Sequence, residues 1–393
     1  MRPRVGITPE QGHALRAMGS RLPEPISDAG ATRSPRPLIS VCIPAYNRPE
    51  PLRELLESIA SQGASDYEIV IREDLSPERL SIRAVVEDFR RSHPRVTTRY
   101  VENEANLGYD GNLRALVDSA RGLYCMFMGN DDLVAPDGLE VLTAALRAYP
   151  ETQVVLRTYA TFDTGGQQIV HRYFAENRYF PPGAESIATF FRRSIVISGL
   201  CVHRDKSAAL RTDRFDGTLL YQLYLTGMLM AGGPGLSVPE VLALYRLGGS
   251  PDFGISPVEQ SYVPGKITPD SSLAFVRGML EIAAHIDRQT NLRVYTLILR
   301  DVGNYSYPLF REHAAGPRRE YVRYVGALLK LGLWRSPLTW AFLLLLGALG
   351  PARSDRLIER LRARLRATPR LGRFSAGRVI PETSRSGNDQ SRR

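Results

Sequence analysis

Two pairs of carboxylates stand at the ends of short apolar runs. Glu73-Asp74 closes the run that begins at Tyr67, and Asp131-Asp132 comes shortly after Leu123–Met128. Adjacent carboxylates at the end of a buried strand are costly unless a positive charge is bound between them. Hard carboxylate oxygens in such a place suit Mg²⁺ or Mn²⁺. Because Asp is also common in turns and helix caps, a simple turn explains Asp131-Asp132 equally well at this point.

The apolar runs alternate with segments of helical periodicity. Leu52, Leu55, Leu56 and Ile59 recur at i, i+3, i+4 and i+7, which predicts an amphipathic helix. Strands that alternate with helices indicate an α/β fold, here a doubly wound, mostly parallel sheet with helices on both faces. Its ligand crevice should lie at the carboxyl ends of the strands. The expected strands are 38–43, 67–71, 96–101, 123–128 and 152–159, and further helices are expected from Pro77 to about Arg90, over 109–120 and over 136–148.

Composition excludes several other classes of protein. The chain has 393 residues, of which 43% are apolar and 23% charged, so it can bury a globular core. Its three cysteines lie far apart, which excludes a disulfide scaffold and a zinc ligand pair. The net charge is +10, but residues 351–393 hold 12 Arg against 4 acidic residues and residues 1–36 hold 6 against 3, which leaves the rest at −1. A neutral body with basic tails argues against nucleic acid and for a tail that meets an anionic surface.

The strand ends carry motifs that resemble those of family 2 glycosyltransferases of the GT-A fold. Four segments match in order and at family-like spacing, and together they cover about residues 38–160. Bacterial O-antigen and capsular polysaccharide members look closest, the abequosyltransferase-like group in particular. Beyond residue 160 the resemblance is faint. The matching segments are Ile39–Arg48, Tyr67–Asp74, Asn106–Asn112 and Gly122–Asp132.

The resemblance implies a nucleotide site. The loop after the first strand matches the segment that lies against the base and ribose, and Asp74 matches the carboxylate that hydrogen-bonds the base. Asn106 and Asn112 match the pocket wall, although Asn106-Leu107-Gly108 also fits an ordinary turn. Arg246 resembles the arginine that binds the diphosphate as a fork donor, and a surface arginine is the plain alternative. The nucleotide-binding residues expected from that first loop are Pro44, Ala45, Tyr46, Asn47 and Arg48.

The resemblance also implies a metal site. Asp131 and Asp132 match the acidic pair of the family, the first nearer the ribose and the second a ligand of Mg²⁺ or Mn²⁺. Asn130 stands where relatives often have a third Asp, and Arg72-Glu73 replaces the more usual Val-Asp. These departures leave the preferred base and the choice of metal open.

The implied reaction needs a metal and a base. A nucleotide-sugar donor loses a diphosphate, and a bound cation stabilises that leaving group. Inverting transfer also needs a base for the acceptor hydroxyl, which in the family is an Asp or Glu at the start of a helix. Asp216 precedes an apolar helical run and matches that position, with Asp213 the next candidate. An ordinary helix N-terminal carboxylate explains Asp216 equally well.

The C-terminal part contains an apolar segment, Leu338–Leu349, between Pro337 and Pro351. A run of about a dozen residues is too short to span a bilayer, which needs about 20. Trp334, Trp340 and the neighbouring arginines fit an interfacial segment. A buried or oligomer-interface helix is the alternative. We therefore expect a cytoplasmic protein, peripheral at the inner face of the plasma membrane.

These observations predict an inverting, metal-dependent hexosyl- or deoxyhexosyltransferase. It would move a sugar from a nucleotide-sugar donor to a glycan or polyprenyl-diphosphate-linked acceptor in surface polysaccharide synthesis. The alternatives are a sugar-phosphate nucleotidyltransferase, whose Gly-rich phosphate loop residues 44–48 do not supply, and a non-catalytic nucleotide-binding protein. The expected organisation is a disordered lead-in (1–37), a glycosyltransferase domain (38–265) with a nucleotide-binding half (38–160) and an acceptor half (161–265), a helical extension (266–333), an amphipathic membrane-associating segment (334–370) and a disordered tail (371–393).

Overall fold

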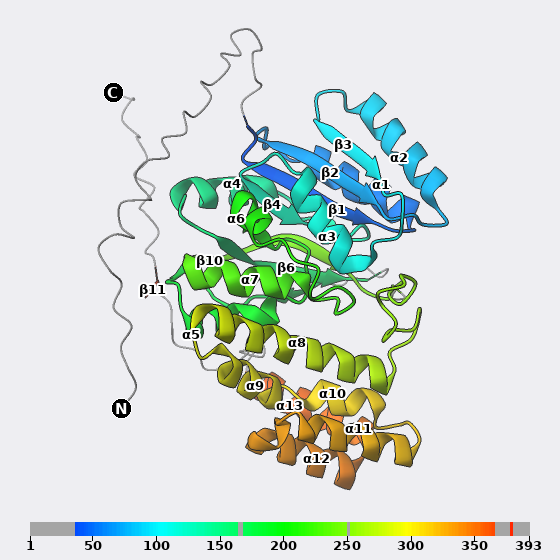
Figure 1. Ribbon diagram of the computed structural model, residues 1–393, viewed down its shortest axis with the longest axis vertical. Helices are drawn as coiled ribbons and strands as arrows, with labels where there is room; N and C mark the ends of the chain where they lie inside the picture. Colours follow the sequence, from blue (N-terminus) through cyan, green and yellow to red (C-terminus); the bar gives the residue numbers. More distant parts are fainter. Residues whose placement is uncertain (1–35, 164–167, 250–251, 366–377, 380–393) are drawn as a thin grey trace, which may run out of the picture. The chain divides into compact units, whose positions relative to one another are not determined.

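A central mixed sheet organises the protein (Figure 1). The computed structural model describes residues 36–163, 168–249, 252–365 and 378–379. Within these ranges the main path of the sheet runs β11-β8-β10-β6-β9-β4-β1-β2-β3, with β5 beside β10 and β7 beside β6; β11 is Arg378–Val379. The predicted lead-in and tail lie almost wholly outside the described residues. The strands up to residue 162 are β1 (Ile39–Ala45), β2 (Tyr67–Glu73), β3 (Thr98–Glu102), β4 (Tyr124–Phe127), β5 (Leu133–Val134) and β6 (Val154–Phe162).

The first strands are parallel and buried on both faces. β1 pairs in parallel with β2 and β4, and β2 pairs in parallel with β3. Along β1, Val41 and Ile43 join one core cluster while Cys42 joins the other. A strand with two buried faces needs apolar residues at every position, and this explains the continuous apolar runs of the sequence.

Helices cover both faces of the sheet, which confirms the predicted α/β class. One face packs on α1 (Pro49–Ala60), α2 (Arg79–Ser92) and α4 (Gly138–Ala148). The other packs on α3 (Gly108–Ser119), α5 (Ala184–Phe191) and α7 (Tyr221–Gly232). In α1 the buried side chains are Leu52, Leu55, Leu56 and Ile59, the four residues of the predicted apolar face.

The segment 161–265 is more regular than its sequence indicates. It contains α6 (Arg204–Ala209) besides α5 and α7, and the strands β7 (Gln168–His171), β8 (Arg178–Phe180), β9 (Cys201–His203) and β10 (Gly235–Arg246). β10 runs parallel to β6, with a register shift between Ser237 and Val241 that accommodates Pro239. Proline within a strand pattern argues against a strand unless a bulge removes the need for its missing hydrogen bond. For that reason the sequence did not predict β10.

Six helices of the described residues follow β10 and confirm a helical C-terminal region. They extend the core that α5 and α7 begin, and Arg192 forms a buried ion pair with Asp301 at 2.6 Å. None of the described helices is long and apolar enough to cross a membrane. These helices are α8 (Pro269–Thr290), α9 (Val294–Asn304), α10 (Tyr307–His313), α11 (Arg318–Lys330), α12 (Pro337–Leu349) and α13 (Pro351–Leu365).

Candidate active site

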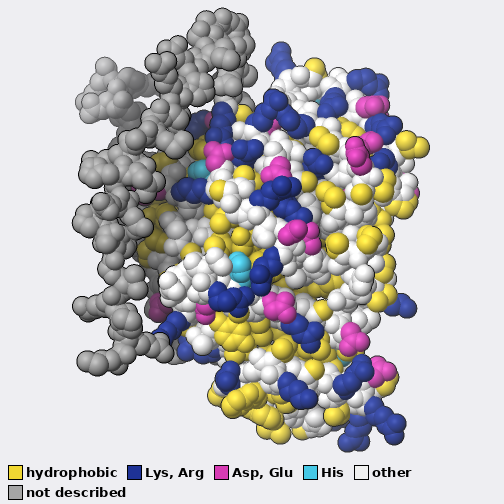
Figure 2. All heavy atoms as spheres, in the orientation of Figure 1, with side chains coloured by type: hydrophobic (Ala, Val, Ile, Leu, Met, Phe, Trp, Pro, Cys, Tyr) yellow, Lys and Arg dark blue, Asp and Glu magenta, His cyan; other side chains and the backbone are white. Residues whose placement is uncertain are grey.

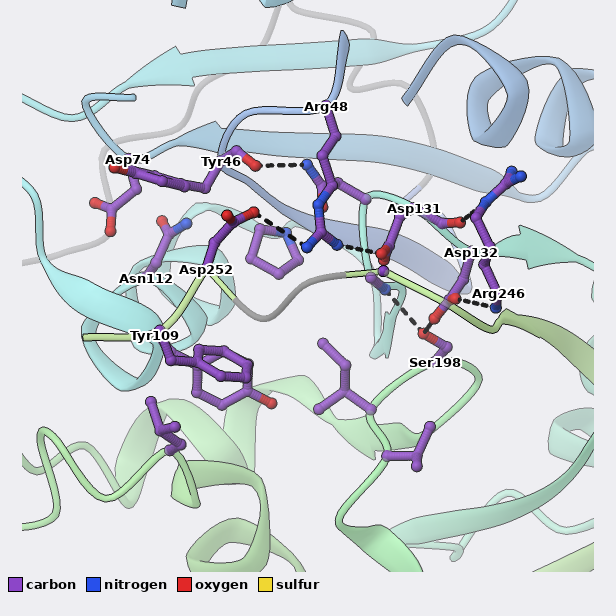
Figure 3. Close-up of a pocket in the computed structure, with 18 of the residues that line it drawn as sticks. Tyr46, Arg48, Asp74, Tyr109, Asn112, Asp131, Asp132, Ser198, Arg246 and Asp252 are labelled. Atoms are coloured by element: carbon purple, nitrogen blue, oxygen red, sulfur yellow. Dashed lines mark hydrogen bonds and ion pairs between the residues drawn. The ribbon is translucent and has the colours of Figure 1, made fainter. Parts of the chain in front are cut away.

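A cavity of about 430 Å³ lies at the carboxyl ends of β1, β2 and β4 (Figure 3). This is where parallel α/β sheets bind their ligands. Five carboxylates and two guanidiniums of the described residues line it, so the lining is acidic. Of the predicted binding residues, Ala45 and Asn47 do not line it, whereas Pro44, Tyr46, Arg48, Asp74, Asn106, Asn112, Asp131, Asp132 and Arg246 do.

Asp74 forms the centre of a polar network at one end of the cavity. One of its oxygens accepts hydrogen bonds from Asn103 Nδ2 at 2.7 Å and from the Leu107 backbone N–H at 2.8 Å. Asn103 Nδ2 also reaches Asn112 Oδ1 at 3.1 Å. Burial raises the pKa of Asp74, although these donors act in the opposite direction. The network holds the carboxylate in one orientation.

Arg48 enters the cavity because the chain turns sharply after β1. Asn47 and Arg48 both have positive φ, at 52° and 61°, a conformation that non-glycine residues rarely adopt. The guanidinium forms ion pairs with Asp131 and, at 3.1 Å, with Asp252 (Figure 3). Arg48 therefore links the end of β4 to the segment that follows β10.

Asp132 is buried and held by two donors. Ser198 Oγ donates to one carboxylate oxygen, and the Arg246 backbone N–H donates to the other at 2.8 Å. Burial, with a further contribution from Asp131, raises its pKa to about 7. Its surroundings thus disfavour the charged form of this carboxylate. Residues 129–132 also form the turn that the plain alternative predicted, since the Asp132 N–H donates to the Gly129 carbonyl at 3.2 Å.

The Arg246 side chain contacts protein groups beside the acidic pair. Its Nε donates to the Asp131 carbonyl at 2.8 Å, and its guanidinium pairs with Glu54 of α1. The side chain lies at the cavity as predicted, but in this conformation two protein acceptors already engage it.

The geometry argues against Asp216 as the base. Asp216 is not among the lining residues, and its two oxygens accept from Arg114 at 2.6 and 2.7 Å. Arg114 also donates to the Thr212 carbonyl, so the pair holds the loop before α7 against α3. A base must lie within reach of the acceptor hydroxyl, and Asp216 lies outside the cavity with both oxygens engaged by one guanidinium.

The sequence interpretation missed four polar residues that shape the site. Ser198, Gln222 and Asp252 line the cavity, and Asn103 orients Asp74. Asn103 follows β3 directly, so its position at a strand end is a signal that could have found it. The other three come from segment 161–265, whose sequence shows no periodic pattern that would identify them.

Residues 252–262, the covering segment, pack across α3. Glu259 is buried and accepts from the backbone N–H groups of Tyr109 at 2.7 Å and Gly254 at 2.8 Å. Tyr262 Oη donates to the Thr218 carbonyl at 2.9 Å. Gly217, at φ 81°, approaches so closely that an added Cβ would lie 2.0 Å from the Val258 carbonyl oxygen. These bonds place Phe253 and Asp252 at the cavity.

Asp110 of α3 orients the chain before α7. Its carboxylate accepts from the backbone N–H groups of Leu219 and Tyr221, both at 2.8 Å. Leu219 has φ 63°, so its backbone conformation is strained and needs such support. Burial raises the pKa of Asp110 to about 7, while the two N–H donors act in the opposite direction.

The raised pKa of Asp110 predicts a pH dependence of stability. Its ordinary value is 3.8, so between about pH 4 and 7 the folded state binds the proton more tightly than the unfolded state. The stability contributed by Asp110 is then present at low pH and is lost as the pH rises towards 7. Thermal unfolding between pH 5 and 8 should show a smaller fall in Tm for Asp110→Asn than for the wild type. Equal slopes would contradict this assignment.

The residues at the acidic end fit a divalent cation. Among the described residues no cluster of three or more His, Cys, Asp or Glu could hold a metal by itself. Mg²⁺ and Mn²⁺ sites in phosphate-transfer enzymes need only one or two carboxylates, because substrate phosphates and water complete the shell. The buried carboxylate of Asp132 beside that of Asp131 is such a donor set.

The fold of this protein, with an acidic cavity at the carboxyl ends of parallel strands, is of the GT-A type. The S. aureus TarS structure (residues 1–349) in complex with UDP-GlcNAc superposes with a TM-score of 0.53 at 18% identity, over 74% of this chain and 79% of that one. At this identity the likeness shows the fold alone.

Sequence comparison then gives the family. Residues 40–210 match the model of Glycosyl transferase family 2, so the chain carries a domain of that family. Abequosyltransferase RfbV of Salmonella typhimurium is 40% identical over 111 residues, which are 28% of this chain and 32% of the relative. Chondroitin synthase of Escherichia coli is 30% identical over 143 residues, 36% and 20% of the two chains. The matches to these relatives thus span a third or less of the relatives' own lengths.

Proposed function

We propose that this protein transfers a sugar from a nucleotide-sugar donor to a glycan or lipid-linked acceptor in bacterial surface polysaccharide synthesis. The observation that carries the proposal is the cavity that joins Asp74 and Asn112 at one end to Asp131 and Asp132 at the other. Its two ends suit the two ends of a nucleotide-sugar, a base that forms hydrogen bonds and a diphosphate that needs a cation. The similarity to RfbV, a bacterial abequosyltransferase, supports sugar transfer, and the acceptor is part of our proposal.

In this proposal each end of the cavity has a separate task. Tyr46 and Pro44 lie against the base, and Asp74 accepts its hydrogen bonds. Asp132 and Asp131 would hold Mg²⁺ or Mn²⁺, which when bound would stabilise the negative charge of the departing diphosphate. Arg48, now paired with Asp131 and Asp252, supplies a second positive charge on the same side.

For the acceptor hydroxyl we propose Asp252 as the base of an inverting transfer. Of the lining carboxylates, Asp74 and Glu259 are engaged by N–H donors, and Asp131 and Asp132 are assigned to the metal. Asp252 forms a single ion pair, and its side chain remains 35% exposed. A carboxylate at the mouth of the cavity can take a proton from an incoming hydroxyl and release it to water.

The acceptor side of the proposal includes a membrane surface. Figure 2 shows hydrophobic side chains gathered at the end formed by α12, with Lys and Arg side chains around them. Trp334, Leu338, Trp340 and Leu344 are exposed there, Leu344 to 72%. An amphipathic segment with tryptophans and arginines suits the interface of an anionic bilayer. We propose that it holds the protein at the inner face of the plasma membrane, near a polyprenyl-diphosphate-linked acceptor.

Replacing Trp340 and Leu344 together by Ser should weaken binding to vesicles of anionic phospholipid at least about tenfold, because each buried apolar side chain contributes about 1.5–3 kcal/mol. Co-sedimentation measures the effect. Leu80→Ser is the matched control, since Leu80 of α2 is equally exposed and lies outside the patch. Equal loss in both variants, or no loss in either, would reject the membrane assignment.

Release of nucleoside diphosphate from a panel of nucleotide-sugars, with Mn²⁺, Mg²⁺ or EDTA, tests the proposed function. We expect slow donor hydrolysis for one base, faster turnover with acceptor extracts, and a loss of both with EDTA. Turnover of a sugar 1-phosphate with a nucleoside triphosphate would instead support the nucleotidyltransferase alternative.

A further inference from the structure

A short segment, residues 193–198, connects to the acidic pair through its last residue. Ser198 Oγ donates to Asp132 (Figure 3) and accepts from the Gly129 backbone N–H at 2.9 Å. The hydroxyl therefore joins this segment to the turn that carries the acidic pair. Between η2 (Arg192–Ser194) and β9 the chain forms neither helix nor strand, so its buried carbonyls need partners from elsewhere in the protein.

The side chain of Arg157 supplies three of these partners. Arg157 lies in β6 and is fully buried. Its Nε donates to the Ser198 carbonyl at 3.0 Å, its Nη1 donates to the Arg193 carbonyl at 2.7 Å, and its Nη2 donates to the Val196 carbonyl. The guanidinium is planar and presents its donors in a rigid fork. One side chain thus fixes the backbone of residues 193–198.

Close packing fixes the Arg157 side chain in turn. Gly199 has φ 81°, and a Cβ added there would lie 2.9 Å from Arg157 Cγ. The guanidinium also lies over the Tyr159 ring, 5.0 Å from its centre. The backbone after Ser198 and the strand that carries Arg157 therefore approach as closely as a glycine allows, and the three donors stay aimed at residues 193–198.

The charge of Arg157 forms no ion pair with any carboxylate of the described residues. A buried cation is costly unless hydrogen bonds or an opposite charge compensate it. Burial lowers the pKa of the guanidinium, and the charge of Asp132 is among the effects that act in the opposite direction. Ser198 links the two groups, with its carbonyl on Arg157 and its hydroxyl on Asp132. The buried cation thus stabilises the acidic end of the cavity through one intervening residue.

We infer that Arg157 is a positioning residue of the metal site, because it fixes residues 193–198 and through Ser198 holds the Asp132 carboxylate in one orientation for the cation. Arg157 acts from outside the cavity, since it is not among the lining residues. Groups that orient a metal ligand in this way affect metal affinity although they do not touch the metal. The inference rests on the proposed function, because it takes Asp132 as the ligand of Mg²⁺ or Mn²⁺.

The affinity for Mn²⁺ tests the inference. The full chain is titrated with Mn²⁺ in the presence of the diphosphate, out of UDP, dTDP, GDP and CDP, that binds the wild type. Electron paramagnetic resonance measures free Mn²⁺, and the same nucleotide without protein is the blank. Arg157→Met removes the three donors and the charge, and it should raise the Kd of Mn²⁺ about tenfold or more.

A double-mutant cycle with Ser198→Ala shows whether Arg157 acts through Ser198. Residues that act along one path have effects that do not add. Arg157→Met combined with Ser198→Ala should therefore bind Mn²⁺ about as weakly as the weaker of the two single variants. A general loss of structure would instead add to the effect of Ser198→Ala.

Two further variants keep the test decisive. Arg193→Met is the matched control, because Arg193 is a guanidinium of the same segment that is 5% exposed and donates to the Thr189 carbonyl. It should leave the Kd of Mn²⁺ unchanged. Arg157→Lys keeps the charge but cannot span three carbonyls, and it should weaken Mn²⁺ about threefold or more. It replaces Arg157→Met in the comparison if that variant does not fold.

The results separate the inference from the proposed function. The inference is overturned if the Arg157 variant leaves the Kd of Mn²⁺ unchanged, if Arg193→Met weakens Mn²⁺ equally, or if the losses of the cycle add. In these three cases the proposed function stands, because the wild type still binds Mn²⁺ and the diphosphate. If none of the four diphosphates binds the wild type with Mn²⁺, the proposed function fails and the inference falls with it.

Discussion

Asp132→Asn should abolish sugar transfer and at the same time stabilise the metal-free protein at pH 8. Without the carboxylate the site loses its metal ligand, and we expect kcat to fall roughly 10³-fold. The pKa of Asp132 is raised to about 7 by burial and by Asp131. The folded state is therefore more stable when Asp132 is protonated, and it loses this stability as the pH rises from about 4 to 7. Asn has the same shape without the charge, and its oxygen can still accept from the Arg246 N–H.

Turnover and thermal unfolding of the same preparation check both halves of this prediction. The matched control is Asp270→Asn, which removes a carboxylate that is 81% exposed on α8. The control should change neither kcat nor Tm noticeably. An inactive Asp132→Asn variant with a lower Tm at pH 8 would mean that the carboxylate is structural, and a fully active one would remove it from the metal site.

Asp252→Asn should lower kcat by roughly 10²–10⁴-fold, the usual contribution of a general base. The donor should still bind, because the amide keeps the shape of the side chain and Arg48 keeps its partner Asp131. Asp216→Asn is the matched comparison. It should keep kcat within a few-fold but lower Tm, since it breaks the bidentate pair with Arg114.

Steady-state kinetics of the two variants, with donor affinity measured separately, decide between the two carboxylates. A large loss of kcat in Asp216→Asn with a mild effect in Asp252→Asn would restore the assignment made from the sequence. It would also require that the Arg114 pair opens when the acceptor binds.

The structure of residues 38–160 was predictable because the sequence signals there are local. β4 is an apolar run with both faces buried, and Asp131 and Asp132 follow it within a few residues. The helical period of the sequence of α1 likewise predicts which of its side chains are buried. Where strands are parallel and consecutive, the order of elements along the chain is enough to bring their carboxyl ends together.

The contacts of residues 161–265 were not predictable, because these residues pair with partners that are distant in the sequence. Asp216 satisfies the local rule for a carboxylate before a helix, yet Arg114, 102 positions earlier, captures both its oxygens. Ser198 meets Asp132 from 66 positions away, and Asp252 meets Arg48 across the sheet.

The measurement that tests the central claim most directly is a thermal-shift screen of UDP, dTDP, GDP and CDP, with and without Mn²⁺, on the wild type and on Asp132→Asn. A ligand that binds the folded state raises Tm according to its concentration and Kd. The account predicts that one diphosphate raises the Tm of the wild type only when Mn²⁺ is present, and that Asp132→Asn shows no such metal-dependent rise. A wild type that none of the four diphosphates shifts, or equal shifts in both proteins, would contradict it.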